Sequence, residues 1–279
     1  MRRFLSAVLL TLPASALAQG DCFPPDDSNE AKVFAVFAVP FAFGPAESPA
    51  ATRPWGLRLA LEASYIPNID VETATPTICR PGKGPENTDF VAVLPRPRAQ
   101  LGLPRGFLLE VGWVPPISVN EAKPHLLGLA LGKVLAFGTD GPSVSLRLHA
   151  TIGQIRAPIT CDNGALKDPQ SECFNGTKSE DRYRPNAFGA DLAGAWSIKD
   201  GRVRPFVGAG INLLRPRFQV HFVNQLGQLD DRRVEVDLER LVLFAGASWF
   251  PTARWGVTGQ VYAAPADAVT GRIAISYGR

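Results

Sequence analysis

Charged residues recur at alternate positions within segments that are otherwise apolar. Six are arginines, Arg58, Arg96, Arg98, Arg147, Arg204 and Arg272, and three are acids, Glu62, Glu110 and Asp191. A buried charge must be paired, because an unpaired one loses several kcal/mol of hydration. These residues therefore predict a salt-bridge network that fills a narrow interior. The alternative is a water-filled pore whose excess of positive charge favours small anions.

The chain offers little acid–base chemistry, since its three histidines are His125, His149 and His221. His149 lies on the same strand face as Arg147 and Ser145, and a serine with a histidine can supply a nucleophile and a base. His221 lies near Asp230 and Asp231, which offers an acid–histidine pair. The simpler interpretations are a hydrogen-bonded interior residue and a loop residue. We therefore predict no catalytic residue and no enzymatic activity.

The first residues are typical of a secretory signal peptide, which is removed from the mature protein. Arg2 and Arg3 form a basic start, residues 4–12 are apolar, and Ala16-Leu17-Ala18 is a small-x-small cleavage site. The apolar run is too short to cross a bilayer as a helix. We predict a signal peptide over residues 1–18 and export by the general route.

Export makes disulfides the expected state of the four cysteines. Cys161 and Cys173 bracket one polar segment and are predicted to pair with each other. By elimination, Cys22 would pair with Cys79. No CxxC or Cys/His spacing indicates zinc, and the arginines beside Asp230 argue against calcium. We predict no metal and no cofactor.

Stretches with an apolar residue at every second position recur along the chain, which is typical of half-buried strands. Ten are predicted: 56–66, 94–103, 107–117, 125–137, 143–158, 186–198, 202–222, 233–250, 255–264 and 269–278. Tight turns at 104–106, 139–142, 199–201 and 251–253 alternate strictly with more open connections, among them the longest and most polar. Short turns at one end and long loops at the other are the outer-membrane barrel pattern.

The alternation gives each strand two faces. The apolar face carries Leu57, Leu59, Leu61, Phe107, Leu109, Val111, Trp113, Val144, Leu146, Leu148, Val203, Val207, Ile211, Val257, Val261, Ile273 and Ile275. The polar face carries Arg58, Glu62, Arg96, Arg98, Gln100, Glu110, Arg147, His149, Asp191, Arg204, Asn212, Gln260 and Arg272. We predict that the apolar face meets lipid and the polar face lines the lumen. The pattern slips near Pro216, which predicts a bulge or bend.

Four of the five tryptophans lie at strand ends beside the tight turns or the start of the barrel. They are Trp55, Trp196, Trp249 and Trp255, and Tyr277 joins them. Aromatic residues gather at membrane interfaces, because one edge is apolar and the other can hydrogen-bond to headgroups and water. The alternative is a set of core tryptophans under loops.

Residues 19–55 fit the strand pattern less well. Residues 30–43 are apolar on every side and are interrupted by Pro40. They could form a short helix, an eleventh strand or a segment packed in the lumen. Because Cys79 falls in a long loop, its pairing with Cys22 would carry this segment across the membrane or through the barrel. We favour an N-terminal segment associated with the lumen.

Together these features resemble the bacterial outer-membrane β-barrel class over roughly residues 56–279. The last strand is apolar at every second position through Ile273, Ile275 and Tyr277, but the chain ends in Gly278-Arg279 instead of Phe or Trp. The resemblance implies an all-β fold, a single up-and-down antiparallel transmembrane β-barrel. About ten strands are expected, with twelve as the alternative. It also implies the outer membrane as location, with membrane lipid and the barrel-assembly machinery as partners.

We predict a porin-like barrel of structural or narrow-pore type, with disulfide-stiffened loops. A pore would pass small solutes, anions included, and the loops could bind a surface ligand. The net charge of +3 is too small to indicate nucleic acid. Two other classes stay open. One is an outer-membrane lipid hydrolase or protease, and the other is a soluble exported β-barrel that binds a small ligand.

Overall fold

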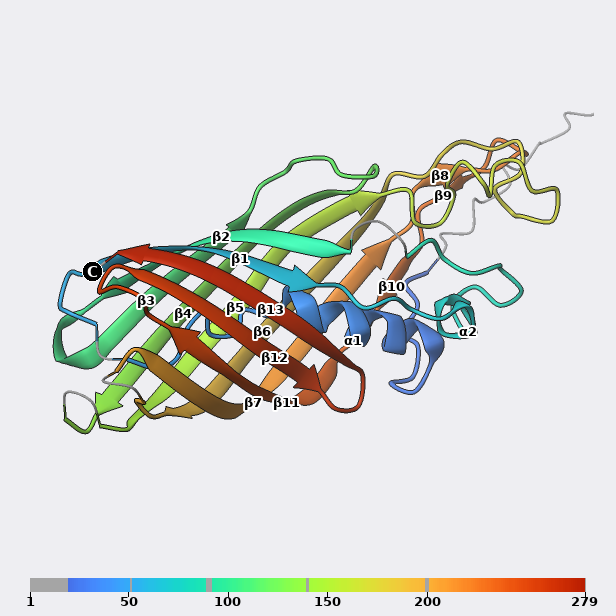
Figure 1. Cartoon of the computed structure of the whole chain (residues 1–279). Coiled ribbons are helices and arrows are strands. Elements are labelled where there is room, and N and C mark those ends of the chain that lie inside the picture. Colours follow the sequence, from blue (N-terminus) through green and yellow to red (C-terminus); the bar gives the residue numbers. More distant parts are fainter. Residues whose placement is uncertain (1–19, 51, 89–91, 139–140, 199–200, 279) are drawn as a thin grey trace, which may run out of the picture.

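Ten long antiparallel strands dominate the protein, for which a computed structural model describes residues 20–50, 52–88, 92–138, 141–198 and 201–278 (Figure 1). The ten are β1 (Leu57–Tyr65), β2 (Val93–Gly102), β3 (Phe107–Val114), β4 (Lys123–Ala136), β5 (Ser143–Ala157), β6 (Asp181–Ala195), β7 (Val203–Gln219), β11 (Leu238–Trp249), β12 (Trp255–Ala264) and β13 (Ala268–Gly278). The predicted signal peptide, residues 1–18, lies outside the described residues.

The ten strands form a closed ring. Each pairs with its neighbours along the chain, and the last strand returns to the first, where Arg58 is opposite Gly278. Closure leaves the ring of ten strands without a free edge. The prediction of a ten-stranded up-and-down barrel is therefore confirmed.

Three details differ from the predicted strands. β6 begins at Asp181, not at residue 186, and the predicted strand 233–250 is divided into β10 (Arg233–Glu235) and β11, which both pair with β7. The expected bulge at Pro216 is wrong. Pro216 stands opposite Pro185, and the β6–β7 register runs without a gap from Arg182–Gln219 to Ala195–Phe206.

The barrel is inside-out relative to a soluble protein. Leu148 and Ile273 point outward and are 59% and 61% exposed, whereas Glu62 and Glu110 point inward and are 1% exposed. An apolar outer surface with a polar interior suits a barrel surrounded by lipid. None of the helices in the described part of the chain is long and apolar enough to cross a membrane.

One end of the barrel, the turn end, carries the short connections. It includes the 3-10 turn η1 (Pro104–Gly106) between β2 and β3. The predicted turns at 139–142 and 199–201 fall partly on residues 139–140 and 199–200, which lie outside the described residues. Trp55, Trp196, Trp249, Trp255 and Tyr277 are all exposed at this end, and the Trp255 and Tyr277 rings lie 4.9 Å apart.

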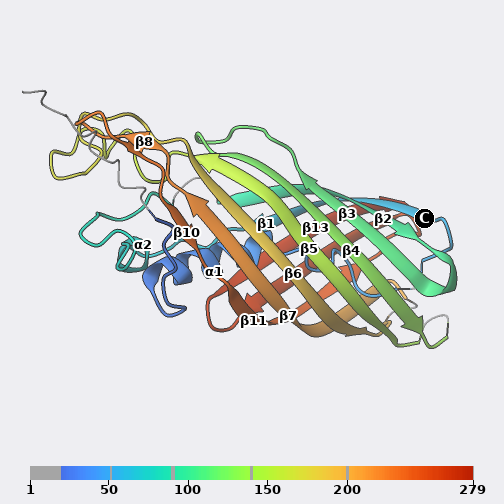
Figure 2. The same ribbon diagram turned by 180° about the vertical axis from the view of Figure 1, so that it is seen from behind.

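The opposite end, the loop end, carries the long connections (Figure 2). It includes the short helix α2 (Val71–Ala74) and a projecting hairpin of β8 (Phe222–Val223) and β9 (Leu229–Asp230). We call residues 66–88, 158–180 and 220–232 the loop-end cap. Both predicted disulfides, Cys22–Cys79 and Cys161–Cys173, are confirmed and lie there.

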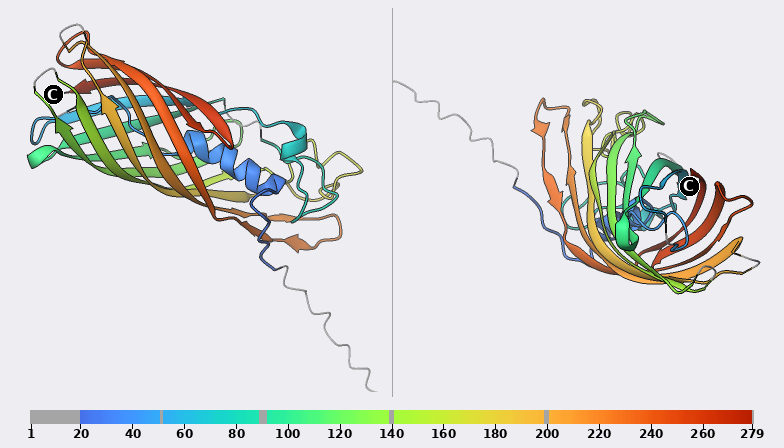
Figure 3. Two further views of the ribbon diagram at one scale, coloured as in Figure 1. Left: turned by 90° about the horizontal axis from the view of Figure 1, so that it is seen from below. Right: turned by 90° about the vertical axis from the view of Figure 1, so that its left-hand side faces the viewer.

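The N-terminal segment threads the barrel from the loop end to the turn end. Helix α1 (Asn29–Phe41) is capped by Ser28, whose side chain accepts a hydrogen bond from Ala31 N. It lies at the loop end (Figures 1 and 3) and contacts β1, β6, β7, β12 and β13, so it packs against several sides of the ring. The following residues reach the turn end, where Ser48 N donates to Ser248 Oγ over 2.8 Å. The two predicted alternatives, a helix and a lumen segment, therefore both hold.

Candidate functional site

Charged residues from five strands of the wall, β1, β2, β3, β5 and β6, form one continuous series of ion pairs in the lumen. Arg98 on β2 bridges Glu62 on β1 and Glu110 on β3, over 2.5 and 2.7 Å. Arg147 on β5 continues it, bridging Glu110 and Asp191 on β6, both over 2.8 Å. Arg96 adds a second contact to Glu62 over 3.3 Å. The alternation of each strand aims these side chains inward. Most of the contacts join adjacent strands, and the Arg147–Glu110 contact spans the intervening β4.

The same arginines hold the N-terminal segment. We call residues 39–49 the plug. Its backbone carbonyl oxygens accept hydrogen bonds from the wall: Val39 from Arg272 over 2.7 Å, Phe41 from Arg96 over 3.0 Å, Phe43 from Arg147 over 3.2 Å, and Gly44 from Arg98 over 3.0 Å. The lumen arginines therefore neutralise the acids and bind the plug at once.

The plug fits the wall through small residues. The Phe43 ring lies 4.0 Å from the Arg98 guanidinium carbon. A Cβ added at Gly112 or Gly128 would lie 2.5 or 2.4 Å from this ring, so both glycines are needed for it to enter. A Cβ at Gly44 would likewise lie 2.5 Å from Arg272 Nη1.

The other predicted lumen residues lie outside this chain of ion pairs or at its ends. His149 is buried, with Nε2 3.5 Å from Asp191 Oδ2. Arg58 pairs near the turn end with Glu47, over 2.9 Å. Arg204 lies beside the Phe250 ring, and no carboxylate contacts it within the described ranges.

Neither predicted pairing, His149 with Ser145 or His221 with Asp230, is joined by a side-chain hydrogen bond among the described residues. Ser145 and His149 are four positions apart on one strand, which separates them by about 13 Å. No hydrogen bond joins them in the part of the chain that is described. His221 is exposed, and its backbone N–H donates to Asp181 Oδ1 over 2.9 Å.

Two cavities lie on either side of the plug contacts and share none of their described lining residues. The one at the turn end has a mixed polar and apolar lining and a volume of about 710 Å³, and its polar residues include Arg58, Gln100, Arg202 and Arg204. The one at the loop end is apolar and has a volume of about 350 Å³. Three phenylalanines of α1 line it, and strand alternation gave no signal for them, because a helix inside a barrel needs no polar face.

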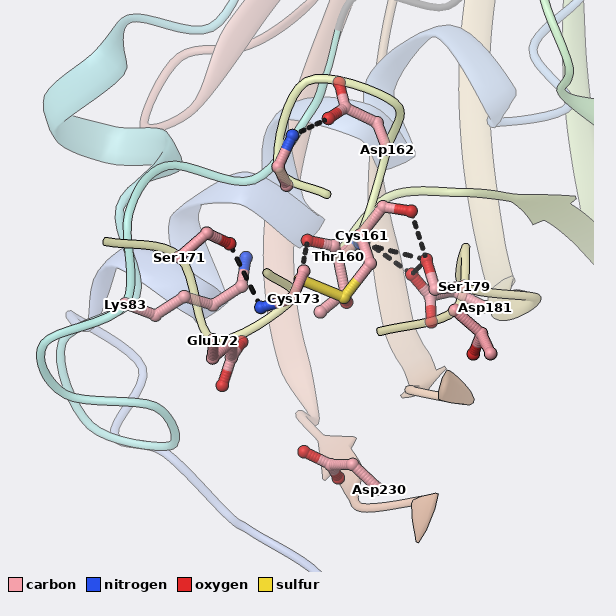
Figure 4. The surroundings of a disulfide bond; sticks show 12 residues. Lys83, Thr160, Cys161, Asp162, Ser171, Glu172, Cys173, Ser179, Asp181 and Asp230 are labelled. Atoms are coloured by element: carbon pink, nitrogen blue, oxygen red, sulfur yellow. Dashed lines mark hydrogen bonds between the residues drawn. A yellow bond between two sulfur atoms is a disulfide. The ribbon is translucent and has the colours of Figure 1, made fainter. Parts of the chain in front are cut away.

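Figure 4 shows how the Cys161–Cys173 bridge fastens the base of the loop-end cap. Cys161 N donates to Ser179 Oγ over 3.0 Å, and Asp181 accepts from Thr160 N over 2.6 Å. Further out, Arg80 contacts both Glu172 and Asp230, over 2.5 and 3.2 Å. The cap is therefore tied by covalent and ionic links.

Asp230 is held ionised by its neighbours. Burial alone would raise the pKa of this carboxyl, but hydrogen bonds from the Arg232 side chain and backbone, with the charge of Arg80, bring the pKa below its ordinary value of 3.8. Ionised Asp230 therefore contributes stability that is present above this ordinary value and is lost as the pH falls through the lowered pKa.

We expect Asp230→Asn to loosen the β8–β9 hairpin at neutral pH and to have little effect in acid. The amide cannot form the ionic contacts, while acid removes the same charge from the wild-type chain. Hydrogen–deuterium exchange of residues 222–230, compared between the two chains at each pH, checks this. A difference as large in strong acid as at neutral pH would contradict it.

Removing the Cys22–Cys79 bridge is expected to cost more stability than removing Cys161–Cys173. The first joins residues 57 positions apart and the second 12. From the chain entropy of the unfolded state, removing the first bridge should lower the free energy of unfolding by at most about 4 kcal/mol, and removing the second by at most about 3 kcal/mol. Urea unfolding of the two Cys→Ser double variants measures both. Equal losses, or a larger loss for Cys161–Cys173, would show that entropy is not the governing effect.

Comparison with known proteins finds similarity only among solved structures. No protein-family model matches the sequence, and the curated proteins contain no match. The chain is similar to solved barrels at low identity. Against Ail, the attachment invasion locus protein of Yersinia pestis, identity is 10% over 81% of this chain and 98% of that one, with a TM-score of 0.30.

Two further solved structures are similar to the same extent. The P. putida toluene transporter TodX shares 15% identity over 86% of this chain and 70% of its own, with a TM-score of 0.34. The N-terminal β-barrel domain of Pseudomonas aeruginosa OprF shares 9% identity over 80% of this chain and 97% of its own, with a TM-score of 0.28. All three are outer-membrane-type barrels, and the present chain has that fold by its own strand pairing.

Proposed function

We propose that this protein is a non-enzymatic outer-membrane barrel of the structural type, whose lumen is held closed by its own N-terminal segment. The observation that carries the proposal is the set of four arginine side chains that donate to plug carbonyls between Val39 and Gly44. A carbonyl has no net charge, so these bonds fix the plug without neutralising the arginines. The acids on the wall do that instead.

This arrangement argues against the anion pore. A conducting pore needs water around its charged groups, so that an ion can exchange one partner for another. Here Arg96, Arg98 and Arg147 are at most 3% exposed and already contact carboxylates. Passing an anion would require breaking these buried ion pairs, which is unfavourable.

We also propose an orientation, with the loop end outside the cell and the turn end in the periplasm. Short periplasmic turns with longer outer loops are the rule for such barrels. The aromatic residues at the turn end would then mark the periplasmic interface. Recovery of the full chain in the outer-membrane fraction, with heat-modifiable migration on a gel, tests the location. Recovery in the soluble periplasmic fraction would favour the soluble binding barrel.

Conductance of the purified full chain in planar bilayers tests the closed lumen. We expect no resolved current steps. Steady steps with anion preference would overturn the structural function in favour of the narrow pore. Phospholipid or peptide turnover that disappears in His149→Ala or His221→Ala chains would instead support the hydrolase or protease alternative.

A further inference from the structure

The apolar cavity at the loop end has the features of a ligand site. Phe34, Phe37 and Phe41 of α1 form one wall, and Leu94, Val114 and Ile155 from the outer parts of β2, β3 and β5 contribute to the other. Its lining is almost wholly apolar. The cavity lies between the helix and the barrel wall, beneath the loop-end cap.

The volume exceeds that of an ordinary packing defect. A cavity of roughly 150 Å³ lined by apolar side chains stays dry and holds one benzene molecule. This one has a volume of about 350 Å³, at the lower end of the range of small-molecule sites. It is large enough for two rings, and empty space of this size would leave its lining without dispersion contacts.

Arg80 supplies one polar group in this wall. Its side chain is 4% exposed, and its Nη2 contacts Glu172 and Asp230. Its Nε and Nη1 are buried and have no hydrogen-bond partner among the residues that the structure describes. A buried donor without a partner is costly, so an acceptor atom on a bound molecule would stabilise this site.

The charges around Arg80 indicate which acceptor fits. Arg80 and Arg232 face Glu172 and Asp230, so these four groups already sum to no net charge. Lys83 and Glu86 form a second balanced pair nearby, over 2.6 Å. A carboxylate ligand would bring an unbalanced negative charge. A carbonyl or ether oxygen would accept a hydrogen bond without adding charge.

We propose that the loop-end cavity binds a neutral apolar molecule of about two rings that carries one hydrogen-bond acceptor, with Arg80 as the donor. The apolar body lies between the three phenylalanines and the strand ends. The site is on the opposite side of the plug from the turn-end cavity, so binding there requires no open lumen. It goes beyond the proposed function and does not depend on it.

Benzophenone is a suitable probe, because it is a neutral two-ring ketone that attaches to nearby C–H groups under ultraviolet light. The folded full chain in lipid nanodiscs is labelled at increasing concentration, and peptide mass spectrometry locates the adducts. We expect saturable labelling on residues 29–41 and on the outer parts of β2, β3 and β5. Labelling confined to lipid-facing residues, or labelling that never saturates, would overturn the proposal.

Three competitors that do not react with light test the acceptor. Dicyclohexyl ketone is expected to displace benzophenone about 5–10-fold more strongly than dicyclohexylmethane, the effect of one hydrogen bond. Dicyclohexylacetate is expected to compete less well than the ketone. If the carboxylate competes best, the proposal that the ligand is neutral is wrong. If the ketone and the hydrocarbon compete equally, Arg80 does not donate a hydrogen bond to the ligand.

Two variants with a control complete the test. Arg80→Lys keeps a cation beside Glu172 and Asp230 but lacks Nε and Nη1, so the preference for the ketone should disappear while hydrocarbon competition stays. Ala122→Phe, which adds a ring at a buried cavity residue, should abolish saturable labelling. Leu146→Phe adds a ring on the lipid face and should leave labelling unchanged. Heat-modifiable migration verifies that each variant is folded.

Discussion

Replacing Arg147 by methionine is expected to lower the free energy of unfolding by about 3–5 kcal/mol, the usual cost of removing one partner of a buried ion pair. Arg147 contacts Glu110, Asp191 and the Phe43 carbonyl. Without it, the ion contact that Asp191 keeps among the described residues is with His149 Nε2, 3.5 Å away. Urea unfolding in lipid vesicles, followed by tryptophan fluorescence, measures the loss.

Arg204→Met is the matched control for this change. It removes the same side chain from the same barrel interior, but from a position with an aromatic contact to Phe250 and no carboxylate contact among the described residues. We expect a loss below about 1 kcal/mol, as for a weak cation–π contact. Adding Asp191→Asn to Arg147→Met should restore part of the stability, because the orphaned charge is removed. Equal losses in the free energy of unfolding for Arg147→Met and Arg204→Met would contradict a stabilising role of the ion-pair network.

Deleting residues 21–49, with Cys79→Ser to avoid a free thiol, is expected to turn a silent barrel into a conducting one. The deletion removes the plug and α1 but no strand of the ring. The freed lumen would hold six arginines against three acids, so current steps should show anion preference. Single-channel recording with a salt gradient gives both conductance and selectivity.

The double variant Cys22→Ser/Cys79→Ser separates the plug from its outer anchor. It keeps all four arginine contacts to the plug carbonyls, so the barrel should stay closed. Conductance in this variant equal to that of the deletion would show that the bridge closes the lumen, not the arginine contacts. Silence in both variants would mean that the wall side chains collapse into the space that the plug leaves.

The strands were predictable where lipid imposes alternation. The predicted stretch 255–264 coincides with β12, since its apolar and polar residues alternate from end to end. The start of β6 was missed for a physical reason. There Arg182 and Arg184 point outward and Tyr183 inward, packed 5.5 Å from the Phe34 ring. Beyond the lipid, charged residues face out and the apolar ones turn in, which reverses the pattern.

The candidate site was only partly predictable. Strand alternation identified the inward charges, since polar residues at every second position of a strand mark the face that points into the lumen. It could not identify the plug, whose contacts use backbone carbonyls and have no signature in side-chain types. Residues 30–43 are apolar all round because the barrel wall and the loop-end cap enclose them, so no periodicity distinguished a helix from a strand. The cysteine count was the one signal that indicated a path through the barrel.

The path of the chain also restricts how the plug can move. It is fixed at the turn end by its continuation into β1, and at the loop end by the bond between Cys22 and Cys79. Residues 22–79 thus form a covalent loop that passes down the inside of the wall and returns up within it. The segment can shift sideways, but it cannot be drawn out through the turn end as a free tail unless that bond is reduced. Under oxidising conditions the lumen could therefore open only by a local rearrangement of the plug, with both of its ends still attached.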